Sequence, residues 1–344
     1  MISFDSDYLE GCLPEILNRI TETNLEQTPG YGEDRYCLEA AEKIRTAIKM
    51  PTAAIHFLVG GTQTNSTVIS AILKPWQGVI CATSGHINVH ETGAIEHGGH
   101  KVIALPCTQG KISASQIEEC ILSHREDPSH EHCVQPGMVY LSFPTEIGTI
   151  YTLSELKAIS DVCRRLRVPL FIDGARLGYG LCSEGCDINL PTLASLVDIF
   201  YIGGTKQGAL FGEAVVFTDP AFCPEFRYNI KQNGGMLAKG RLLGLQFSTL
   251  FGDNLYYKAS EHAVELALNI RDAFSKKGFS FLSESGSNLQ FPILSDSQAE
   301  DLRRDFSFEN WERTDSGHIA VRFCTSWATR EKDVQSLISA IEAL

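Results

Sequence analysis

Two short apolar runs, each followed at once by polar and glycine residues, constrain the fold of this sequence most strongly. The first, 168–172, leads into Asp173-Gly174-Ala175-Arg176, and the second, 197–202, leads into a glycine turn that carries Lys206. Runs of this kind are typical of buried parallel strands, and ligands bind outside the carboxyl ends of such strands. We therefore expect Asp173, Arg176 and Lys206 to share one crevice at the edge of a sheet.

The same alternation of strand and helix extends along the chain and predicts an α/β fold. Further strands are expected at 53–59, 78–82, 101–106, 138–142 and 213–217, the last returning from the site, with helices at 13–20, 37–50, 115–123 and 152–166. A long helix, 254–277, leads to strands at 278–282, 290–294 and 318–323 and to a last helix, 331–344. We expect a large domain with a mostly parallel sheet and an N-terminal arm, 1–260, and a small α+β domain, 261–344.

Composition narrows the class of protein. With 344 residues, 43% of them hydrophobic, the chain can bury a large core, and its net charge of −13 argues against nucleic acid or anionic lipid as partners. No apolar run approaches the length of a membrane helix and the start lacks a signal-peptide pattern, so a cytoplasmic protein is expected. The 11 cysteines are scattered without a disulfide framework, which predicts that most are reduced and buried.

The residue types at the expected crevice suit pyridoxal phosphate. A lysine amine such as Lys206 forms a Schiff base with an aldehyde, and a carboxylate such as Asp173 pairs with the protonated pyridine nitrogen and keeps the ring an electron sink. The Thr205 hydroxyl could reach the phosphate. Each residue alone has an ordinary alternative, since Asp-Gly is a common turn and Lys206 could be a surface lysine. Their combination with Arg176 favours the cofactor.

A predicted anion site supports this interpretation. The run 53–59 meets Gly60-Gly61-Thr62-Gln63 and then a helical segment that reaches Leu73. A strand, a glycine turn and a helix N-terminus can bind a phosphate, although such turns also serve simple geometry. The segment matches neither the dinucleotide fingerprint nor the P-loop, which argues against a nicotinamide oxidoreductase.

The segment 171–177, Phe-Ile-Asp-Gly-Ala-Arg-Leu, resembles the threonine aldolase and β-eliminating lyase group of fold-type I pyridoxal phosphate enzymes. The resemblance spans nearly the whole chain and implies an aspartate-aminotransferase-like large domain. It also implies roles for further residues: the phosphate bound by Gly61, Thr62 and Gln63, the cofactor ring covered by His86, the substrate carboxylate held by Ser6, Arg176 and Arg322, and Tyr31 lining the site.

The sequence departs from this family at 143–148, Phe-Pro-Thr-Glu-Ile-Gly. Better-known aldolases carry a substrate-facing histidine where this chain has Ile147, so the catalytic base stays open between His86, Glu146 and a bound water. His86 could also be a loop histidine, and Glu146 could simply hold a turn. His86 and His90 are four residues apart, but no pattern of ligands fixes a metal geometry, and no metal is expected.

The sequence therefore predicts a lyase that cleaves a β-hydroxy-α-amino acid, such as threonine or allo-threonine, to glycine and an aldehyde. The same cofactor also supports β-elimination, transamination and racemisation, and a non-catalytic scaffold is a further alternative. The resemblance extends to a basic segment with Lys231 and Gly234-Gly235-Met236, which implies contact with a neighbouring subunit in a homodimer or homotetramer.

Overall fold

The seven strands predicted before residue 220 all form, and they make one sheet. The computed structural model describes residues 1–344, and the sheet has the order β2-β8-β7-β6-β5-β3-β4. β8 runs antiparallel to both of its neighbours, and every other pair is parallel. The strands are β2 (Ala54–Leu58), β3 (Gln77–Ala82), β4 (Val102–Leu105), β5 (Gln135–Ser142), β6 (Leu170–Asp173), β7 (Ile199–Gly203) and β8 (Glu213–Phe217).

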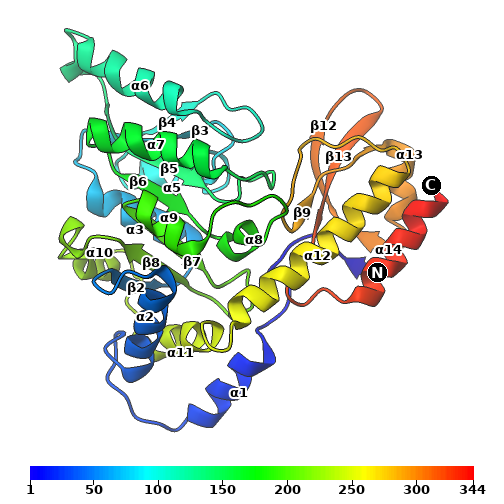
Figure 1. Cartoon of the computed structure of the whole chain (residues 1–344), viewed down its shortest axis with the longest axis horizontal. Coiled ribbons are helices and arrows are strands. Elements are labelled where there is room, and N and C mark those ends of the chain that lie inside the picture. The colour runs from blue at the N-terminus through cyan, green and yellow to red at the C-terminus, as the bar shows by residue number, and fades with distance from the viewer.

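Helices cover both faces of this sheet, as Figure 1 shows. Successive residues of a strand point to opposite faces, so Val139 and Leu141 of β5 join one core while Met138 and Tyr140 join the other. The larger core is closed by α1 (Pro14–Thr23), α2 (Arg35–Ile48), α6 (Ala114–Glu126), α7 (Leu153–Leu166), α9 (Leu190–Leu196) and α11 (Arg241–Leu250). The smaller core is closed by α3 (Gly61–Ile72), α4 (His86–Val89), α5 (Ala94–His97) and α10 (Phe226–Gln232).

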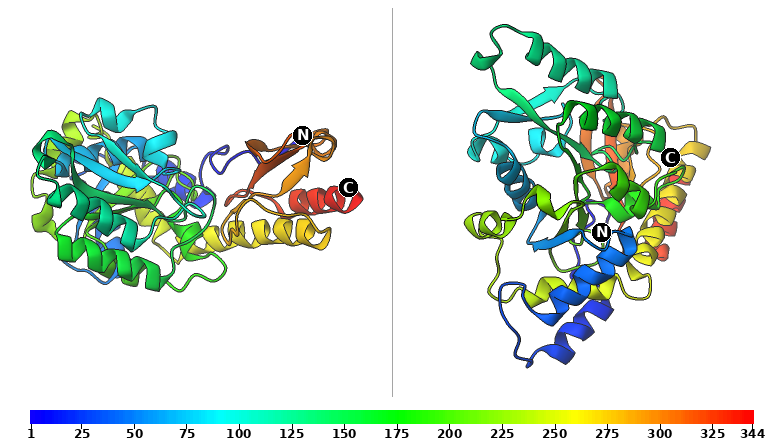
Figure 2. Two further views of the ribbon diagram at one scale, coloured as in Figure 1. Left: turned by 90° about the horizontal axis from the view of Figure 1, so that it is seen from above. Right: turned by 60° about the vertical axis from the view of Figure 1, so that its left-hand side comes forward.

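A second lobe holds a smaller sheet of the order β10-β13-β12, with β9 also paired to β13. Its elements are β9 (Leu289–Gln290), β10 (Ile293–Ser295), β12 (Glu309–Arg313), β13 (His318–Cys324), α13 (Asp296–Leu302) and α14 (Glu331–Ala343). The N-terminal strand β1 (Ile2–Ser3) pairs in parallel with β11 (Phe306–Ser307), so both chain ends lie in this lobe, as the left view of Figure 2 also shows.

The helix α12 (Leu255–Lys276) runs from one lobe to the other. Tyr256 and Ala259 belong to the larger core, whereas Leu266 and Ile270 belong to the core of the second lobe. The predicted boundary between 260 and 261 falls between these two sets of contacts. The division into 1–260 and 261–344 stays an interpretation, because Phe4 also packs in the second lobe.

The second lobe differs from the prediction in three places. The strand expected at 290–294 is interrupted by Phe291 and Pro292, between β9 and β10. No strand forms at 278–282, where only Phe281 makes a bridge, to Pro292, because a proline has no N–H to continue a ladder. The strand β12 was missed because four of its five side chains are exposed, which leaves no apolar alternation. It brings Trp311 to the site described below.

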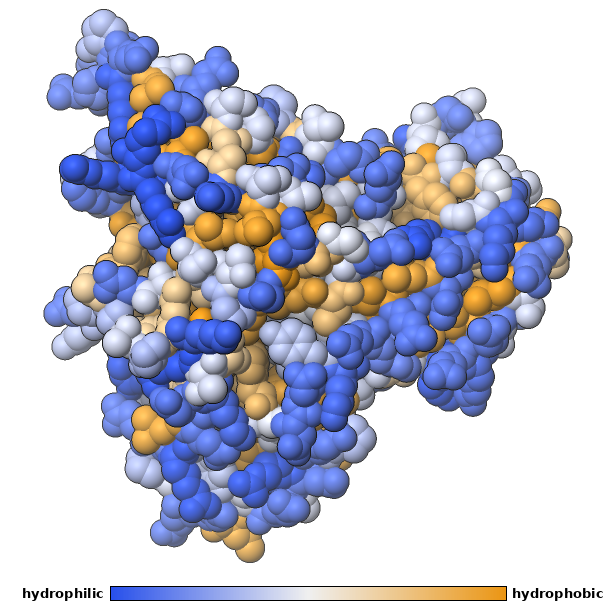
Figure 3. Space-filling model, in the orientation of Figure 1, coloured by the Kyte–Doolittle hydropathy of each residue, from blue (hydrophilic) through white to orange (hydrophobic).

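The remaining expectations concern cysteines and membranes. None of the 11 cysteines is paired in a disulfide, but only Cys37, Cys81, Cys163 and Cys324 are buried, fewer than expected. No helix has both the length and the apolar character needed to cross a bilayer. The face seen in Figure 3 is mostly hydrophilic, and hydrophobic side chains gather toward the middle of the view, where the lobes meet.

Candidate active site

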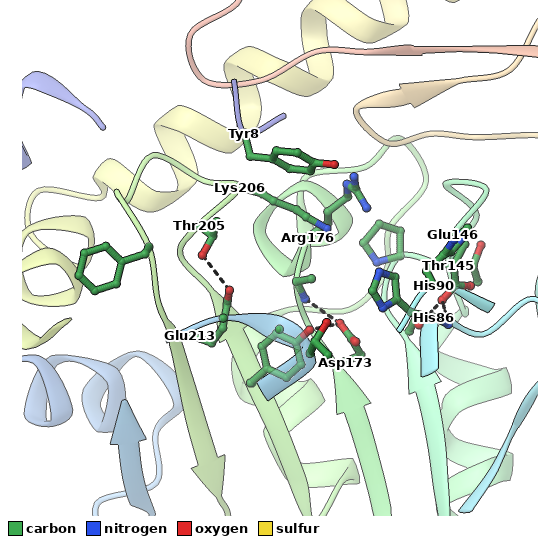
Figure 4. A pocket seen from close by; sticks show the side chains of 18 of the residues that line it. Tyr8, His86, His90, Thr145, Glu146, Asp173, Arg176, Thr205, Lys206 and Glu213 are labelled. Carbon is green, nitrogen blue, oxygen red and sulfur yellow. Dashed lines mark hydrogen bonds between the residues drawn. The ribbon is translucent and has the colours of Figure 1, made fainter. Parts of the chain in front are cut away.

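A cavity of about 520 Å³ lies at the carboxyl ends of the parallel strands, between the two lobes. This volume is typical of small-molecule sites. Residues from β12 and β13 complete its wall, and Figure 4 shows the side chains that point into it. Nine residues predicted from the sequence line the cavity: Gly61, Thr62, His86, Glu146, Asp173, Arg176, Thr205, Lys206 and Arg322.

Asp173, the last residue of β6, lies at the floor of the cavity and is buried. Its carboxylate accepts hydrogen bonds from Tyr140 at 2.5 Å, from Asn65 and the Ala175 N–H at 3.0 Å each, and from Tyr201. Burial opposes ionisation, but the nearby His86 and these donors outweigh it and lower the pKa of the Asp173 carboxyl. The cavity therefore has a fixed negative charge at its floor.

Lys206 follows β7 and extends into the cavity next to Arg176 (Figure 4). Its Nζ lies 6.0 Å from the centre of the Tyr8 ring. Burial, followed by the positive charge of Arg176, lowers the pKa of the Lys206 ammonium below its ordinary value. A lowered pKa increases the fraction of free amine, the form that attacks an aldehyde.

Arg176 is held by a buried carboxylate. Its Nε donates to Asp7 Oδ2 at 2.7 Å and its Nη2 to Asp7 Oδ1 at 3.0 Å, while Asn288 also donates to Asp7 at 3.0 Å. Burial opposes the charge on Asp7, but Arg176 and Lys206 outweigh it and lower the pKa of Asp7. The pair fixes the guanidinium at the cavity wall, where its remaining nitrogen can bind a carboxylate.

Arg322 reaches the same cavity from β13 in the second lobe. Its guanidinium pairs with Glu309, donates to the Asp5 carbonyl at 2.8 Å, and lies 5.4 Å from the centre of the Trp311 ring. Glu309 is 48% exposed, so an incoming carboxylate can compete with it for Arg322. The two arginines therefore approach the cavity from different lobes.

His86 begins α4 and is connected to Asp173 through hydrogen bonds. Its Nδ1 lies 2.8 Å from Glu91 Oε1, which also accepts from Asn65 Nδ2 at 2.7 Å. The same Asn65 nitrogen donates to Asp173. This chain of contacts fixes the imidazole at the cavity wall on the side of the Asp173 carboxylate.

Glu146 supports the turn that carries His86. Its Oε1 accepts hydrogen bonds from the His86 N–H at 2.9 Å and from the Ser142 hydroxyl at 2.5 Å. Burial raises the pKa of Glu146. These contacts correspond to the turn-holding alternative, and a catalytic role for Glu146 stays a prediction.

The N-terminus of α3 supplies free backbone N–H groups to the cavity. Gly60 precedes the helix without a side-chain cap, and Gly61 and Thr62 line the cavity. Thr205, predicted to reach a phosphate, instead donates its hydroxyl to Glu213 Oε1 at 2.9 Å and accepts from the Gly212 N–H at 3.0 Å. The helix terminus is thus the better anion site.

Three predicted residues do not line the cavity of this chain. Gln63 accepts from the Val59 N–H at 3.1 Å and donates to the Asn233 carbonyl at 3.0 Å, so its side chain closes the turn. The Ser6 hydroxyl is buried without a hydrogen-bond partner. Tyr31 is half exposed outside the cavity, with the Lys231 ammonium 5.1 Å from its ring centre. Their binding roles stay predictions.

Other residues at the cavity were missed: Tyr8, His90, Tyr201, Glu213, Glu309 and Trp311. Burial raises the pKa of Glu213 to about 8. A charged residue at the start of a fully buried strand was the available signal for Glu213, and a tyrosine within an apolar run was the signal for Tyr201. No sequence signal identified Glu309 and Trp311, because β12 was not recognised.

Known proteins resemble the chain over its whole length. A low-specificity L-threonine aldolase of Pseudomonas aeruginosa is 30% identical, with 97% of this chain and 95% of that protein covered. A threonine aldolase structure from Leishmania major is 41% identical with a TM-score of 0.96, covering 100% of this chain and 99% of that one. An aspartate aminotransferase from Thermus thermophilus is 13% identical with a TM-score of 0.72, covering 100% of this chain and 92% of that one. This last likeness confirms the predicted aspartate-aminotransferase-like fold.

The sequence also matches the family described as β-eliminating lyase over residues 4–294. That range includes most of the cavity, from Tyr8 through Asp173 and Lys206 to Glu213. The strands β12 and β13, which bring Trp311 and Arg322, lie beyond it. The chain belongs to the β-eliminating lyase family.

Proposed function

We propose that the protein is a pyridoxal-phosphate-dependent aldolase that cleaves threonine or allo-threonine to glycine and acetaldehyde. The observation that carries this proposal is the pair of Lys206 and Asp173 in one cavity, with the pKa of each shifted toward the form that the cofactor needs. The amine shifts toward its neutral form and the carboxyl toward its charged form. The threonine aldolases from two organisms that share the whole length of the chain support the choice of reaction.

The residues of the cavity fit pyridoxal phosphate. Lys206 would hold its aldehyde carbon, Asp173 its pyridine nitrogen, and the uncapped N-terminus of α3 at Gly61 and Thr62 its phosphate. His86 would cover one face of the ring. When bound, the cofactor supplies an electron sink for the carbon from which a bond is broken.

Arg176 and Arg322 would hold the α-carboxylate of the substrate. Arg176 is already fixed by Asp7, whereas Arg322 would exchange Glu309 for the substrate. A guanidinium binds a carboxylate through two parallel hydrogen bonds, which fix its orientation. Because these arginines come from different lobes, substrate binding would connect the lobes across the cavity.

We also infer a homodimer or homotetramer in the cytoplasm. The support is the resemblance of the segment around Lys231 and Gly234-Gly235-Met236 to a family segment that reaches a neighbouring subunit. Tyr31 lies with Lys231 on the surface rather than in the cavity of its own chain. Light scattering of the purified protein gives the mass, and a monomer would contradict the inference.

The cofactor is tested by absorption spectra of the wild-type protein and of Lys206→Ala after addition of pyridoxal phosphate. We expect the wild type to show a visible band that borohydride reduction fixes on Lys206, and the variant to lose both this band and all threonine cleavage. Lys157→Ala is the matched control, since Lys157 is exposed on α7. A folded wild-type protein that never shows the band would reject the cofactor.

The reaction is tested by product analysis with threonine and allo-threonine. Glycine and acetaldehyde in equal amounts support the aldolase. A 2-keto acid would indicate elimination or transamination, and inversion at Cα without cleavage would indicate racemisation. If the visible band is present, a 2-keto acid or inversion at Cα without cleavage would reject the aldolase while keeping the cofactor.

A further inference from the structure

The ring of His90 lines the cavity and has no hydrogen-bond partner in the chain. His90 follows directly after α4, and its ring centre lies 5.5 Å from that of His86 and 6.1 Å from that of Trp311. Both ring nitrogens are therefore available to a bound molecule. The imidazole lies between α4 of the large lobe and β12 of the second lobe.

The other candidate bases of the cavity are held by the protein. His86 uses Nδ1 for Glu91, and Glu146 uses Oε1 for the His86 N–H and the Ser142 hydroxyl. The charged groups that act on Glu146 are Asp173, at the floor of the cavity, and His86, at its wall. His86 and Glu146 therefore lie on the side of the cavity that would hold the cofactor.

His90 lies instead on the side where the substrate would bind. The charged groups that face it are His86 from α4, Glu309 from β12, Arg322 from β13 and Lys206 from the loop after β7. Burial, followed by His86, lowers the pKa of His90, and Glu309 opposes this effect. This shift favours the neutral imidazole, the form that accepts a proton.

We propose that His90 is the group that accepts the β-hydroxyl proton of the substrate. The inference rests on the proposed aldolase function and names the base that the sequence left open. Lys206, Arg322, His90 and Trp311 line the same cavity. With its α-carboxylate at Arg322 and its α-amino group at the Lys206 position, the substrate would have its side chain within reach of the wall formed by His90 and Trp311.

The β-hydroxyl proton moves to a nitrogen of His90, and the O–H electron pair becomes the second bond of the aldehyde carbonyl. The Cα–Cβ bond breaks, and its electron pair stays at Cα, where the bound cofactor would supply the electron sink. A proton then adds to Cα to give glycine, and His90 returns its own proton to solvent.

The test compares two reactions of the loaded enzyme in His90→Asn. Threonine cleavage needs a base for the β-hydroxyl, whereas exchange of the glycine α-proton with deuterium from solvent needs the same cofactor and carboxylate site but no such base. We expect cleavage to fall by about 100-fold or more, while exchange and the visible cofactor band stay at the wild-type level. NMR follows the exchange, and release of acetaldehyde follows the cleavage.

Two further variants make the result specific. His97→Asn removes an exposed histidine of α5 outside the cavity and should leave both reactions unchanged. Glu146→Gln tests the rival base. Cleavage at the wild-type rate in His90→Asn, an equal loss of both reactions, or a selective loss of cleavage in Glu146→Gln alone would overturn the role of His90.

The outcome separates this inference from the proposed function. A wild-type protein that exchanges glycine but does not cleave threonine would reject the aldolase, and the role of His90 with it. A wild-type protein that cleaves threonine while His90→Asn does so equally well would reject only the role of His90. His90→Gln, compared by thermal unfolding, guards against a variant that loses cleavage because it is poorly folded.

Discussion

The buried pair of Asp7 and Arg176 allows a quantitative prediction for Asp7→Asn. The Asp7 side chain is fully buried, Arg176 is 14% exposed, and two hydrogen bonds of 2.7 and 3.0 Å join them. Unit charges about 4 Å apart attract by about 4 kcal/mol at an effective dielectric constant near 20. Removing one partner of a buried pair costs about 3–5 kcal/mol. Because Arg176 keeps some contact with the cavity, we expect a loss of about 3 kcal/mol in the free energy of unfolding.

Urea unfolding of the cofactor-free protein at pH 7 measures this loss. The matched control is Asp296→Asn, which breaks the exposed pair of Asp296 with Arg313 and should cost at most about 1 kcal/mol. Asp7→Asn should also raise KM for threonine, because the Arg176 guanidinium loses the carboxylate that orients it. If both variants lost the same small free energy, the buried pair would not stabilise the fold and the reasoning would be refuted.

Two further predictions concern carboxylates at the cavity. Glu309→Gln removes the competitor for Arg322. Glu309 is 48% exposed, and pairs with such an exposed member contribute about 0.2–1 kcal/mol, so KM for threonine should fall up to about fivefold with kcat unchanged. Steady-state kinetics check this, and a higher KM would contradict it. Burial raises the pKa of Glu213 to about 8, so the native state of the wild type holds an extra proton above the ordinary pKa of a glutamate. Its free energy of unfolding should therefore decline as the pH rises from about 4.5 to about 8, by up to about 1.4 kcal/mol per pH unit, and Glu213→Gln should lack this part of the decline. Urea unfolding across this range should show the free energy of unfolding of Glu213→Gln rising relative to that of the wild type toward pH 8. If the two free energies changed with pH in parallel, this would count against a buried, protonated Glu213.

The parts of the fold that the sequence predicted are those in which a residue pattern has a local cause. The strands of the large sheet are buried on both faces, so they appear as continuous apolar runs, and their ends are visible where Asp173 and Lys206 follow. The glycine turn before α3 was visible for a similar reason. These features brought nine of the twelve predicted site residues into one cavity.

The parts that could not be predicted depend on contacts between distant segments. Asp7 and Arg176 are 169 positions apart, and nothing near either residue indicates the other. Glu309 and Trp311 lie on a strand with mostly exposed side chains, so no alternation of apolar and polar residues indicates the strand. The hydrogen bond from Thr205 to Glu213 could not be predicted either, because Glu213 follows only after the loop has turned back into β8.

The pKa values of Asp173 and Lys206 are both lowered, which favours the charged carboxylate and the neutral amine, and this explains why the cavity suits one cofactor. Asp173 is buried and Lys206 is partly buried, and burial alone would favour the neutral form of both groups. Donors converge on Asp173 from β5, β7 and α3, so its negative charge survives. The Lys206 ammonium instead faces the like charge of Arg176, whose own carboxylate partner is already engaged. The cavity therefore offers the Asp173 carboxylate to a protonated ring nitrogen and the free amine of Lys206 to an aldehyde. Exchanging the surroundings of these two residues would abolish both properties.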